Sequence, residues 1–190
     1  MDTISNEAET GQQKFILRPA RTSDIKAIRE VARITWNITY AHSVSPSNRE
    51  RVIASSYSDS SLRRSFSREG RDNWFWVAET PGNPDQPSQI VGFADIAVRP
   101  GAQPHAELTR IYVLPEWQRQ GVGKALIDAL LAELRALRPE LRPPRLYLSV
   151  AAHNRQAIAF YEQRGFRHNR DFQASLPMQL LDMQEYVLDI

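Results

Sequence analysis

Apolar residues recur at helical spacing in two long segments of this chain. In residues 21–41 the apolar positions share one helical face: Ile25, Ile28, Val31, Ala32 and Ile34. The Thr-Ser-Asp run at residues 22–24 stands just before this face, and its side-chain oxygens suit a helix start. From Val122 to about Arg138, a leucine stripe repeats the pattern at Leu126, Leu130, Leu134 and Leu137. Both segments are expected to be helices that bury one face.

Other segments are dense in β-branched and aromatic residues and are expected to be strands. They comprise residues 15–20, 73–80, 90–100, 106–115, 145–150 and 185–190. Shorter helices are expected after a turn at Pro46 and at residues 154–165. Strands that follow one another directly favour antiparallel pairing, whereas a helix between two strands requires a parallel crossover. This order predicts an α/β fold, with a mixed, mostly antiparallel central sheet and helices on both faces.

The length of the chain suits a single domain. Its 190 residues can bury one sizeable core, and this domain is expected to span residues 14–190. Residues 1–13 hold too few apolar groups to offset the entropy of ordering, so a flexible leader is expected there.

Composition narrows the classes of function. Lys and Arg total 24 against 22 Asp and Glu, and this small net charge gives no reason to expect nucleic acid as a partner. The chain has no cysteine, which excludes disulfides, thiolate metal sites and a cysteine nucleophile. The four histidines show no metal-ligand spacing, so no metal is expected. Without a membrane-spanning run or a signal-peptide pattern, we expect a cytoplasmic protein with no membrane partner.

A glycine-containing turn precedes the second long helix, in the sequence EWQRQGVGKALIDALL at residues 116–131. Such turns can cradle phosphates, but two known patterns fail here. A P-loop would need glycine at position 118 and a hydroxyl at 125, where the chain has Gln118 and Ala125. A dinucleotide fingerprint starting at Gly121 would need glycine at 126, where Leu126 stands.

The segment from Gln118 to Gly123 does fit Gln/Arg-x-x-Gly-x-Gly/Ala, and here the chain resembles the GNAT superfamily of acetyl-CoA-dependent N-acetyltransferases. A helix N-terminus offers free N–H groups and partial positive charge to a pyrophosphate, and glycine lets the phosphates approach. The resemblance implies acetyl-CoA as cosubstrate, bound by Gln118, Arg119, Gln120, Gly121, Val122, Gly123 and Lys124. A glycine turn selected only for close packing of strand against helix is the structural alternative.

The resemblance also carries an expectation for the strand before this turn. In the superfamily a β-bulge splays this strand from its parallel neighbour, and pantetheine lies in the opened V. The backbone of Ile111, Tyr112 and Val113 is thereby implied to pair with pantetheine. Pro115 cannot donate to a strand ladder, so pairing is expected to fail near it.

A second stretch, LSVAAHNRQAIAFYEQRGF at residues 148–166, resembles the superfamily's second cofactor motif. Asn154 stands at an N-cap position, and Gly165 is suited to end the helix. Tyr161 follows Asn154 by two helical turns, on the same face. The resemblance implies that Asn154 and Ala157 contact the cofactor and that Tyr161 protonates the departing CoA thiolate. A tyrosine of the core is the alternative for Tyr161.

An alkylammonium must lose a proton before it attacks a thioester, so a base is needed. Glu107, on the strand that would carry the acetyl group, is the candidate, directly or through water. Strict alternation places Glu107 with Thr109, Ile111 and Val113, opposite Leu108, Arg110 and Tyr112. A surface glutamate at a strand end is the alternative. The resemblance further implies direct attack by the amine, without a covalent enzyme intermediate.

The acceptor side is less determined by the sequence. The resemblance implies that the first two helices and the last hairpin enclose the acceptor. Trp36, Tyr40 and Trp74 are candidates to surround an alkylammonium by cation–π contact, with core aromatics as the alternative.

Residues 35–48 are similar to the branch that acetylates spermidine and spermine, which makes a small amine such as a polyamine the expected substrate. Carboxylates for a polyamine are available at Asp95, Glu107 and Asp182. A protein N-terminus or lysine is the alternative acceptor, and a non-catalytic acyl-CoA-binding module is the alternative of another class. The apolar residues 186–190 suit either a homodimer contact or the last strand of the chain's own sheet.

Overall fold

The computed structural model describes residues 15–68, 72–82, 87–99 and 104–190, so the expected leader at residues 1–13 lies outside the described residues. The strands are β1 Ile16–Pro19, β2 Asn73–Thr80, β3 Gln89–Arg99, β4 His105–Val113, β5 Arg145–Ala151, β6 Arg167–Leu176 and β7 Gln179–Asp189. The helices are α1 Ile25–Thr39, α2 Pro46–Ser56, α3 Asp59–Phe66, α4 Val122–Ala136 and α5 Arg155–Glu162, with 3₁₀ turns η1 Thr22–Asp24 and η2 Pro115–Trp117.

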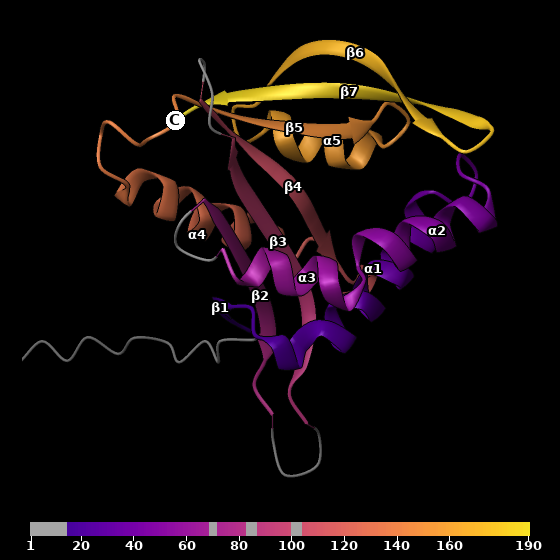
Figure 1. The fold of residues 1–190 in the computed structure, drawn as a ribbon, viewed down its shortest axis with the longest axis horizontal. Helices are drawn as coiled ribbons and strands as arrows, with labels where there is room; N and C mark the ends of the chain where they lie inside the picture. The colour runs from indigo at the N-terminus through magenta and orange to yellow at the C-terminus, as the bar shows by residue number, and fades with distance from the viewer. Residues whose placement is uncertain (1–14, 69–71, 83–86, 100–103) are drawn as a thin grey trace, which may run out of the picture.

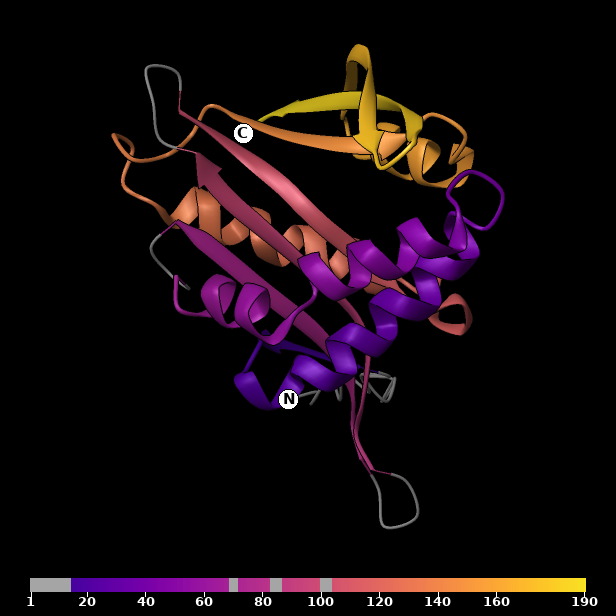
Figure 2. The same ribbon diagram turned by 45° about the vertical axis from the view of Figure 1, so that its right-hand side comes forward.

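The described strands form one sheet in the order β1-β2-β3-β4-β5-β7-β6. Neighbouring strands are antiparallel except β4 and β5, which are parallel and joined through the crossover helix α4. Helices α1 and α3 cover one face of the sheet and α4 covers the other (Figure 1, Figure 2). The predicted mixed, mostly antiparallel sheet with helices on both faces is confirmed.

The C-terminal strand completes the chain's own sheet. β7 lies between β5 and β6 and is paired along both edges, with Tyr186 opposite Leu148 and His168. A homodimer formed by adding strands at β7 is therefore not available to this fold, because β7 has no free edge.

The start of α1 differs from the predicted side-chain cap. Residues Thr22–Asp24 form η1, and no side chain caps α1 itself. Instead the buried Asp24 carboxylate accepts a hydrogen bond from the Arg21 backbone N–H at 2.7 Å and pairs with Arg18 of β1 at 2.7 Å. Arg18 also pairs with Glu79 of β2 at 2.6 Å. This network holds the beginning of α1 against the edge of the sheet.

A β-bulge in β4 inserts one extra residue opposite β3. Asp95 pairs with Arg110, whereas the next residue, Ile96, pairs with Leu108, so Thr109 has no partner position on β3. A bulge of this kind bends the strand and shifts its alternation by one residue.

The predicted assignment of β4 side chains to faces is therefore wrong beyond Thr109. Cross-strand partners lie on the same face of the sheet. The partners on β3 are two residues apart from one another and so share one face. They are Ala97, Asp95 and Phe93, and their β4 partners Glu107, Arg110 and Tyr112 therefore share that face as well. Ile111 and Val113 lie on the opposite face, with Leu108. The partner of Asp95 on β2, Phe75, contacts Phe66 of α3 at 5.1 Å between ring centroids, so the face of Glu107 is the one that α1 and α3 cover.

The parallel pair β4–β5 separates soon after it begins. Pairing covers residues 106–108 opposite 146–148, although β4 continues to Val113 and β5 to Ala151. The sheet is splayed at the bulge, as predicted. Pairing of β4 with β3 continues to Val113, and the Leu114 N–H donates to the Val91 carbonyl at 2.9 Å, so this pairing ends just before Pro115, as expected. Pairing of β4 with β5 already ends at Leu108.

Candidate active site

The N-terminus of α4 is open. Gly121 occupies the N-cap position with a φ of 86°, in the left-handed region, and Arg119 also has a positive φ, of 59°. Among the described residues no side chain caps this helix, and the Ala125 N–H makes its first hydrogen bond, to the Gly121 carbonyl at 2.9 Å. The preceding N–H groups therefore point out of the helix together with the positive end of its dipole. This is the geometry of an anion site.

Glycine is required at the two positions of the turn for different physical reasons. A Cβ added at Gly121 would meet no atom of the described residues within 4 Å, although its φ already disfavours an L side chain. A Cβ added at Gly123 would lie 3.2 Å from the Phe160 ring of α5. Gly121 thus leaves space for a ligand, whereas Gly123 permits the close packing of α4 against α5. The packing interpretation of the glycine turn holds at Gly123, whereas phosphate binding at Gly121 stays a prediction.

Helix α5 has the capping that its sequence predicts. The Asn154 Oδ1 accepts a hydrogen bond from the Ala157 N–H at 3.2 Å, and Gly165 follows the helix with a φ of 84°. Tyr161, near the end of this helix, is 7% exposed. Burial, with a smaller contribution from Tyr40, raises the pKa of the Tyr161 phenol above its ordinary value. A phenol in this environment stays protonated at neutral pH, as a general acid must.

The ring of Tyr161 contacts those of Phe160 and Phe166, with centroids 5.4 and 5.8 Å away. A separate group of aromatic side chains lies between α1, the end of α2 and β4. Trp36 and Tyr40 of α1 pack with ring centroids 4.2 Å apart, and Tyr57 packs edge-on against Tyr112 of β4 at 6.4 Å. Burial, then the neighbouring Tyr112, raises the pKa of Tyr40. Burial also raises the pKa of Tyr57 to about 12. Sequence reasoning missed the side chains of Tyr57 and Tyr112, since no spacing connects them to Tyr161.

Trp74 does not join this aromatic group. It is 3% exposed and pairs with Ile96, whose face of the sheet is the one that α4 covers. Trp36 and Tyr40 come from α1, on the other face. The structure therefore brings two of the three aromatic candidates together and places Trp74 in the core.

Glu107 lies in the closed part of the V, next to its parallel partner Tyr147. Its carboxylate forms an ion pair with Arg99 at 2.8 Å, and its side chain is 41% exposed. Tyr161 belongs to α5, which follows β5 beyond residues 146–148, the part of β5 that pairs with β4. The structure therefore does not bring the two candidate catalytic groups together.

The three candidate carboxylates for a polyamine have separate partners. Asp95, 2% exposed, pairs with Arg110 at 3.3 Å, and burial raises its pKa although Arg110 opposes this. Glu107 pairs with Arg99, and Asp182 accepts a hydrogen bond from Gln173 at 2.9 Å. No acidic pocket forms from these three residues.

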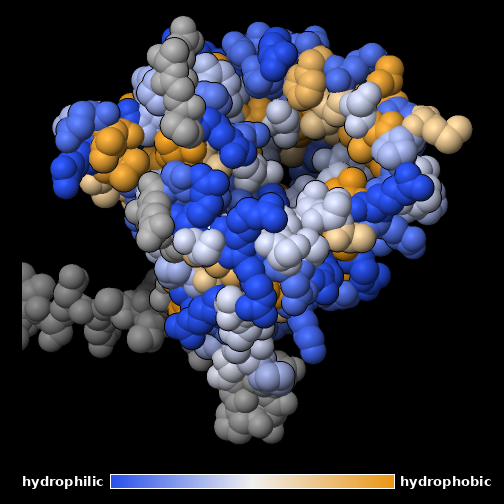
Figure 3. Space-filling model, in the orientation of Figure 1, coloured by the Kyte–Doolittle hydropathy of each residue, from blue (hydrophilic) through white to orange (hydrophobic). Residues whose placement is uncertain are grey.

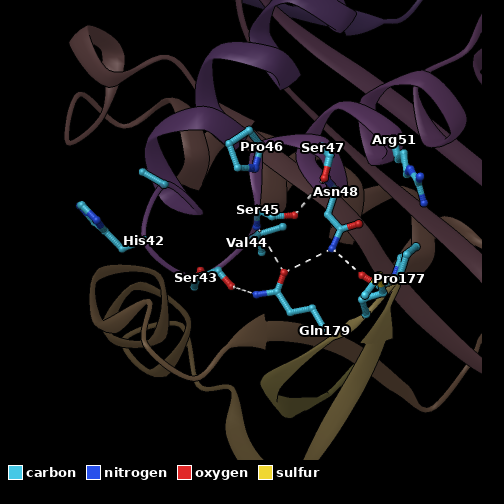
Figure 4. A pocket seen from close by; sticks show the side chains of 12 residues that line it. His42, Ser43, Val44, Ser45, Pro46, Ser47, Asn48, Arg51, Pro177 and Gln179 are labelled. Carbon is cyan, nitrogen blue, oxygen red and sulfur yellow. Dashed lines mark hydrogen bonds between the residues drawn. The ribbon is translucent and has the colours of Figure 1, made fainter.

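A pocket of about 590 Å³ lies between the α1–α2 connection and the β6–β7 turn, lined by residues 41–48, Arg51 and residues 177–179 (Figure 4). The buried Asn48 donates to the Pro177 carbonyl at 3.0 Å and to the Gln179 Oε1 at 3.3 Å. Gln179 also donates to the Ser43 carbonyl. Figure 3 shows a recess between the region of β5–β7 and that of α1–α2. The two segments expected to enclose the acceptor are thus joined by hydrogen bonds.

No group of three or more His, Cys, Asp or Glu side chains in residues 15–68, 72–82, 87–99 and 104–190 could hold a metal ion. None of the described helices is both long and apolar enough to span a membrane.

An uncapped helix N-terminus beside a splayed parallel strand pair is an arrangement that can accept the diphosphate of a nucleotide-linked ligand. The family model of the Acetyltransferase (GNAT) family matches residues 33–166. The chain belongs to this family, and it is an N-acetyltransferase of the acetyl-CoA-dependent class.

Individual relatives agree with this assignment. A spermidine N(1)-acetyltransferase of Thermoplasma acidophilum is 29% identical over 80% of this chain and 87% of its own. The Escherichia coli [ribosomal protein bS18]-alanine N-acetyltransferase is 44% identical over 32% of this chain and 38% of its own. The crystal structure of PaiA N-acetyltransferase of T. acidophilum with coenzyme A superposes with a TM-score of 0.67, at 26% identity, over 90% of this chain and 99% of that one.

Proposed function

We propose that this enzyme transfers the acetyl group of acetyl-CoA to a primary amine by direct attack. The observation that carries the proposal is the uncapped N-terminus of α4 beside the unpaired edge of β4. The first can accept a pyrophosphate, and the second offers free backbone groups to the amides of pantetheine.

The proposed contacts use residues of both motifs. The turn from Gln118 to Lys124 binds the pyrophosphate through backbone N–H groups, with the exposed Arg119 and Lys124 adding positive charge. The backbone of residues 111–113 pairs with pantetheine. Asn154 and Ala157, at the beginning of α5, contact the same ligand from the other side of the V.

Acetyl-CoA supplies a thioester, whose thiolate is a good leaving group. The neutral amine forms the new C–N bond as the C–S bond breaks, and the Tyr161 phenol gives its proton to the departing thiolate. The proton lost by the amine has to leave through water, and Glu107 can receive it only through such a chain because it lies in the closed part of the V. A proton from solvent then converts the resulting phenolate back to the phenol.

Two acceptors have support. A polyamine is favoured by the similarity to the Thermoplasma spermidine enzyme. A protein N-terminus is favoured by the local similarity to the bS18-alanine enzyme and by an open pocket at the surface.

The cysteine-free composition is the support for a cytoplasmic location.

Thermal unfolding with and without acetyl-CoA tests the proposed donor. Saturating ligand should raise the melting temperature by several degrees, because it binds only the folded state. Gly121→Ala should abolish most of this rise by filling the space for the phosphates. Gly165→Ala is the matched control, since both glycines have a positive φ and each substitution should cost about 1 kcal/mol in strain. Equal ligand responses in the two variants would contradict the proposed phosphate site.

A further inference from the structure

The pocket between the α1–α2 connection and the β6–β7 turn has an unusual charge for an enzyme related to polyamine acetyltransferases. Among the described residues, no Asp or Glu lines it, whereas Arg51 and His42 do. The first turn of α2 also lines it, which adds the positive end of that helix dipole. The electrostatic sign of the pocket is therefore positive.

The carboxylates on the neighbouring face of the sheet do not change this sign. Asp95 pairs with Arg110, Glu107 with Arg99, and Glu185 with Arg170 at 3.0 Å. Glu185 pairs with Ser149 of β5, and Glu107 pairs with Tyr147 of the same strand. Because Ser149 and Tyr147 are two residues apart, they lie on one face of the sheet, and Glu185 therefore lies on the face of Glu107. Each negative charge is thus already matched by an arginine.

Arg51 itself has no such partner. Its guanidinium makes no hydrogen bond or ion pair with any of the described residues. Figure 4 shows this side chain extending from α2 toward the side of the pocket formed by Pro177. The nearby Arg49 differs, because it donates to the Asn37 Oδ1 at 3.0 Å and to carbonyls at the end of α1. Arg51 is available to a ligand.

The pocket lies next to the candidate reaction centre. Its lining includes Ser43, whose hydroxyl lies 3.2 Å from the His153 Nε2, and His153 directly precedes Asn154, the cap of the helix that carries Tyr161. An acceptor whose amine reaches the thioester beside Tyr161 would therefore place its other end toward Arg51.

We propose that the acceptor is a primary amine whose distal end carries a carboxylate, and that Arg51 determines this specificity by pairing with it. The inference rests on the proposed N-acetylation and names its substrate class. A guanidinium suits a carboxylate because it donates two parallel hydrogen bonds. A polyamine would instead bring a second ammonium toward Arg51, and like charges repel.

A matched series of acceptors tests the proposal by thiol release from acetyl-CoA. Linear amines with chains of about three to six carbons would each be compared with a terminal carboxylate, methyl or ammonium group. The carboxylate member should have the highest kcat/KM and the ammonium member the lowest. The same comparison on a short peptide with glutamate or lysine at its second residue distinguishes a free amino acid from a peptide as the source of the carboxylate.

Two arginine variants complete the test. Arg51→Gln should lower kcat/KM for the carboxylate acceptors by about fivefold, the size expected for a partly exposed ion pair, and leave the methyl acceptors unchanged. Arg64→Gln removes an exposed arginine from α3, outside the pocket lining, and should change neither.

Either of two results would overturn the proposal: a preference for diamines, or a carboxylate preference that survives Arg51→Gln. A melting-temperature rise with acetyl-CoA but no acetylation of any acceptor would also overturn it, while leaving the donor assignment in place. Absence of that rise would instead count against the proposed function itself.

Discussion

The ring of Tyr161 is buried, with the ring centroids of Phe160 and Phe166 at 5.4 and 5.8 Å, and this environment favours the neutral phenol. Its pKa lies above the ordinary value of a tyrosine, so the proton is retained at neutral pH and is lost only at strongly alkaline pH. A CoA thiol has a pKa near that of free cysteine, about 8.5, so its thiolate is stable enough to leave and basic enough to take a proton from a well-placed donor.

Tyr161→Phe should therefore lower kcat by about 100-fold, the usual effect of removing a general acid, while the melting-temperature rise with acetyl-CoA remains. In the unsubstituted enzyme, activity should not decline between pH 8 and about pH 10 through ionisation of this phenol. Tyr186→Phe is a suitable control, because the Tyr186 hydroxyl donates to Glu162 rather than pointing at the V. An unchanged kcat in Tyr161→Phe would remove this residue from the acid role.

At the scale of elements, the bulge in β4 is accompanied by a buried ion pair. Asp95 and Arg110 are the cross-strand partners next to the unpaired Thr109, and Arg110 also lies over the Tyr57 ring, 5.2 Å from its centroid. Arg110 donates to the Ser56 carbonyl at 3.2 Å. These contacts hold the bulged strand against α2, at the point where β4 leaves β5.

Arg110→Met should destabilise the fold by about 3 kcal/mol, because it leaves a buried carboxylate without its partner. Arg99→Met removes the other arginine that pairs across β3 and β4. Its pair with Glu107 is exposed, so the cost should be below about 1 kcal/mol. Chemical unfolding of both variants measures the difference, and equal costs would contradict the structural role of the buried pair.

The pH dependence of the Arg110→Met variant follows from Asp95. Burial raises the pKa of Asp95 in the folded state, so the folded state binds the proton more tightly than the unfolded one. The associated stability is present below the unfolded pKa, near 4, and is lost as pH rises through the folded pKa. Without Arg110 this loss should increase, so the destabilisation should be larger at pH 8 than at pH 4.5.

The bulge also explains an error in reading β4 from its sequence. Period-two alternation placed Glu107 with Ile111 and Val113, but one inserted residue, Thr109, reverses every later side chain. No glycine or proline stands at this point of β4 to indicate the irregularity.

The helices were more predictable, since Leu126, Leu130 and Leu134 are all fully buried as their spacing predicts.

At the scale of the whole molecule, Asn48 joins segments that are far apart in the chain. Its side chain donates to the Pro177 carbonyl and to Gln179, at sequence separations of 129 and 131 residues. Asn48 itself is 4% exposed, and both hydrogen bonds are partly buried. The contact fixes the β6–β7 turn relative to the first turn of α2, and with it the width of the pocket.

Asn48→Ala should loosen this pocket and raise KM for the amine by about fivefold, the equivalent of one lost hydrogen bond. The response to acetyl-CoA should not change, because the proposed phosphate site lies at the N-terminus of α4, away from Asn48. Gln173→Ala is the matched control, since it removes a hydrogen bond between β6 and β7 that involves no residue of the pocket lining. A KM that stays constant in Asn48→Ala would show that the pocket does not receive the acceptor.

The sequence by itself determined the elements, their order and the local geometry of the Gly121 turn and the Asn154 cap. The turn at Gln118–Gly123 and the cap at Asn154 depend on neighbours within a few residues, and local hydrogen bonding and backbone freedom are fixed at that range. Only the tertiary structure decided the acceptor side. Trp74 lies in the core, and Glu107 forms an exposed ion pair with Arg99. Arg51 lines a pocket together with residues 177–179. The burial of Trp74 depends on β3 and α4, and the face of Glu107 depends on a one-residue change of register in β4. The pocket at Arg51 depends on residues more than a hundred positions away, and none of the three has a local signal.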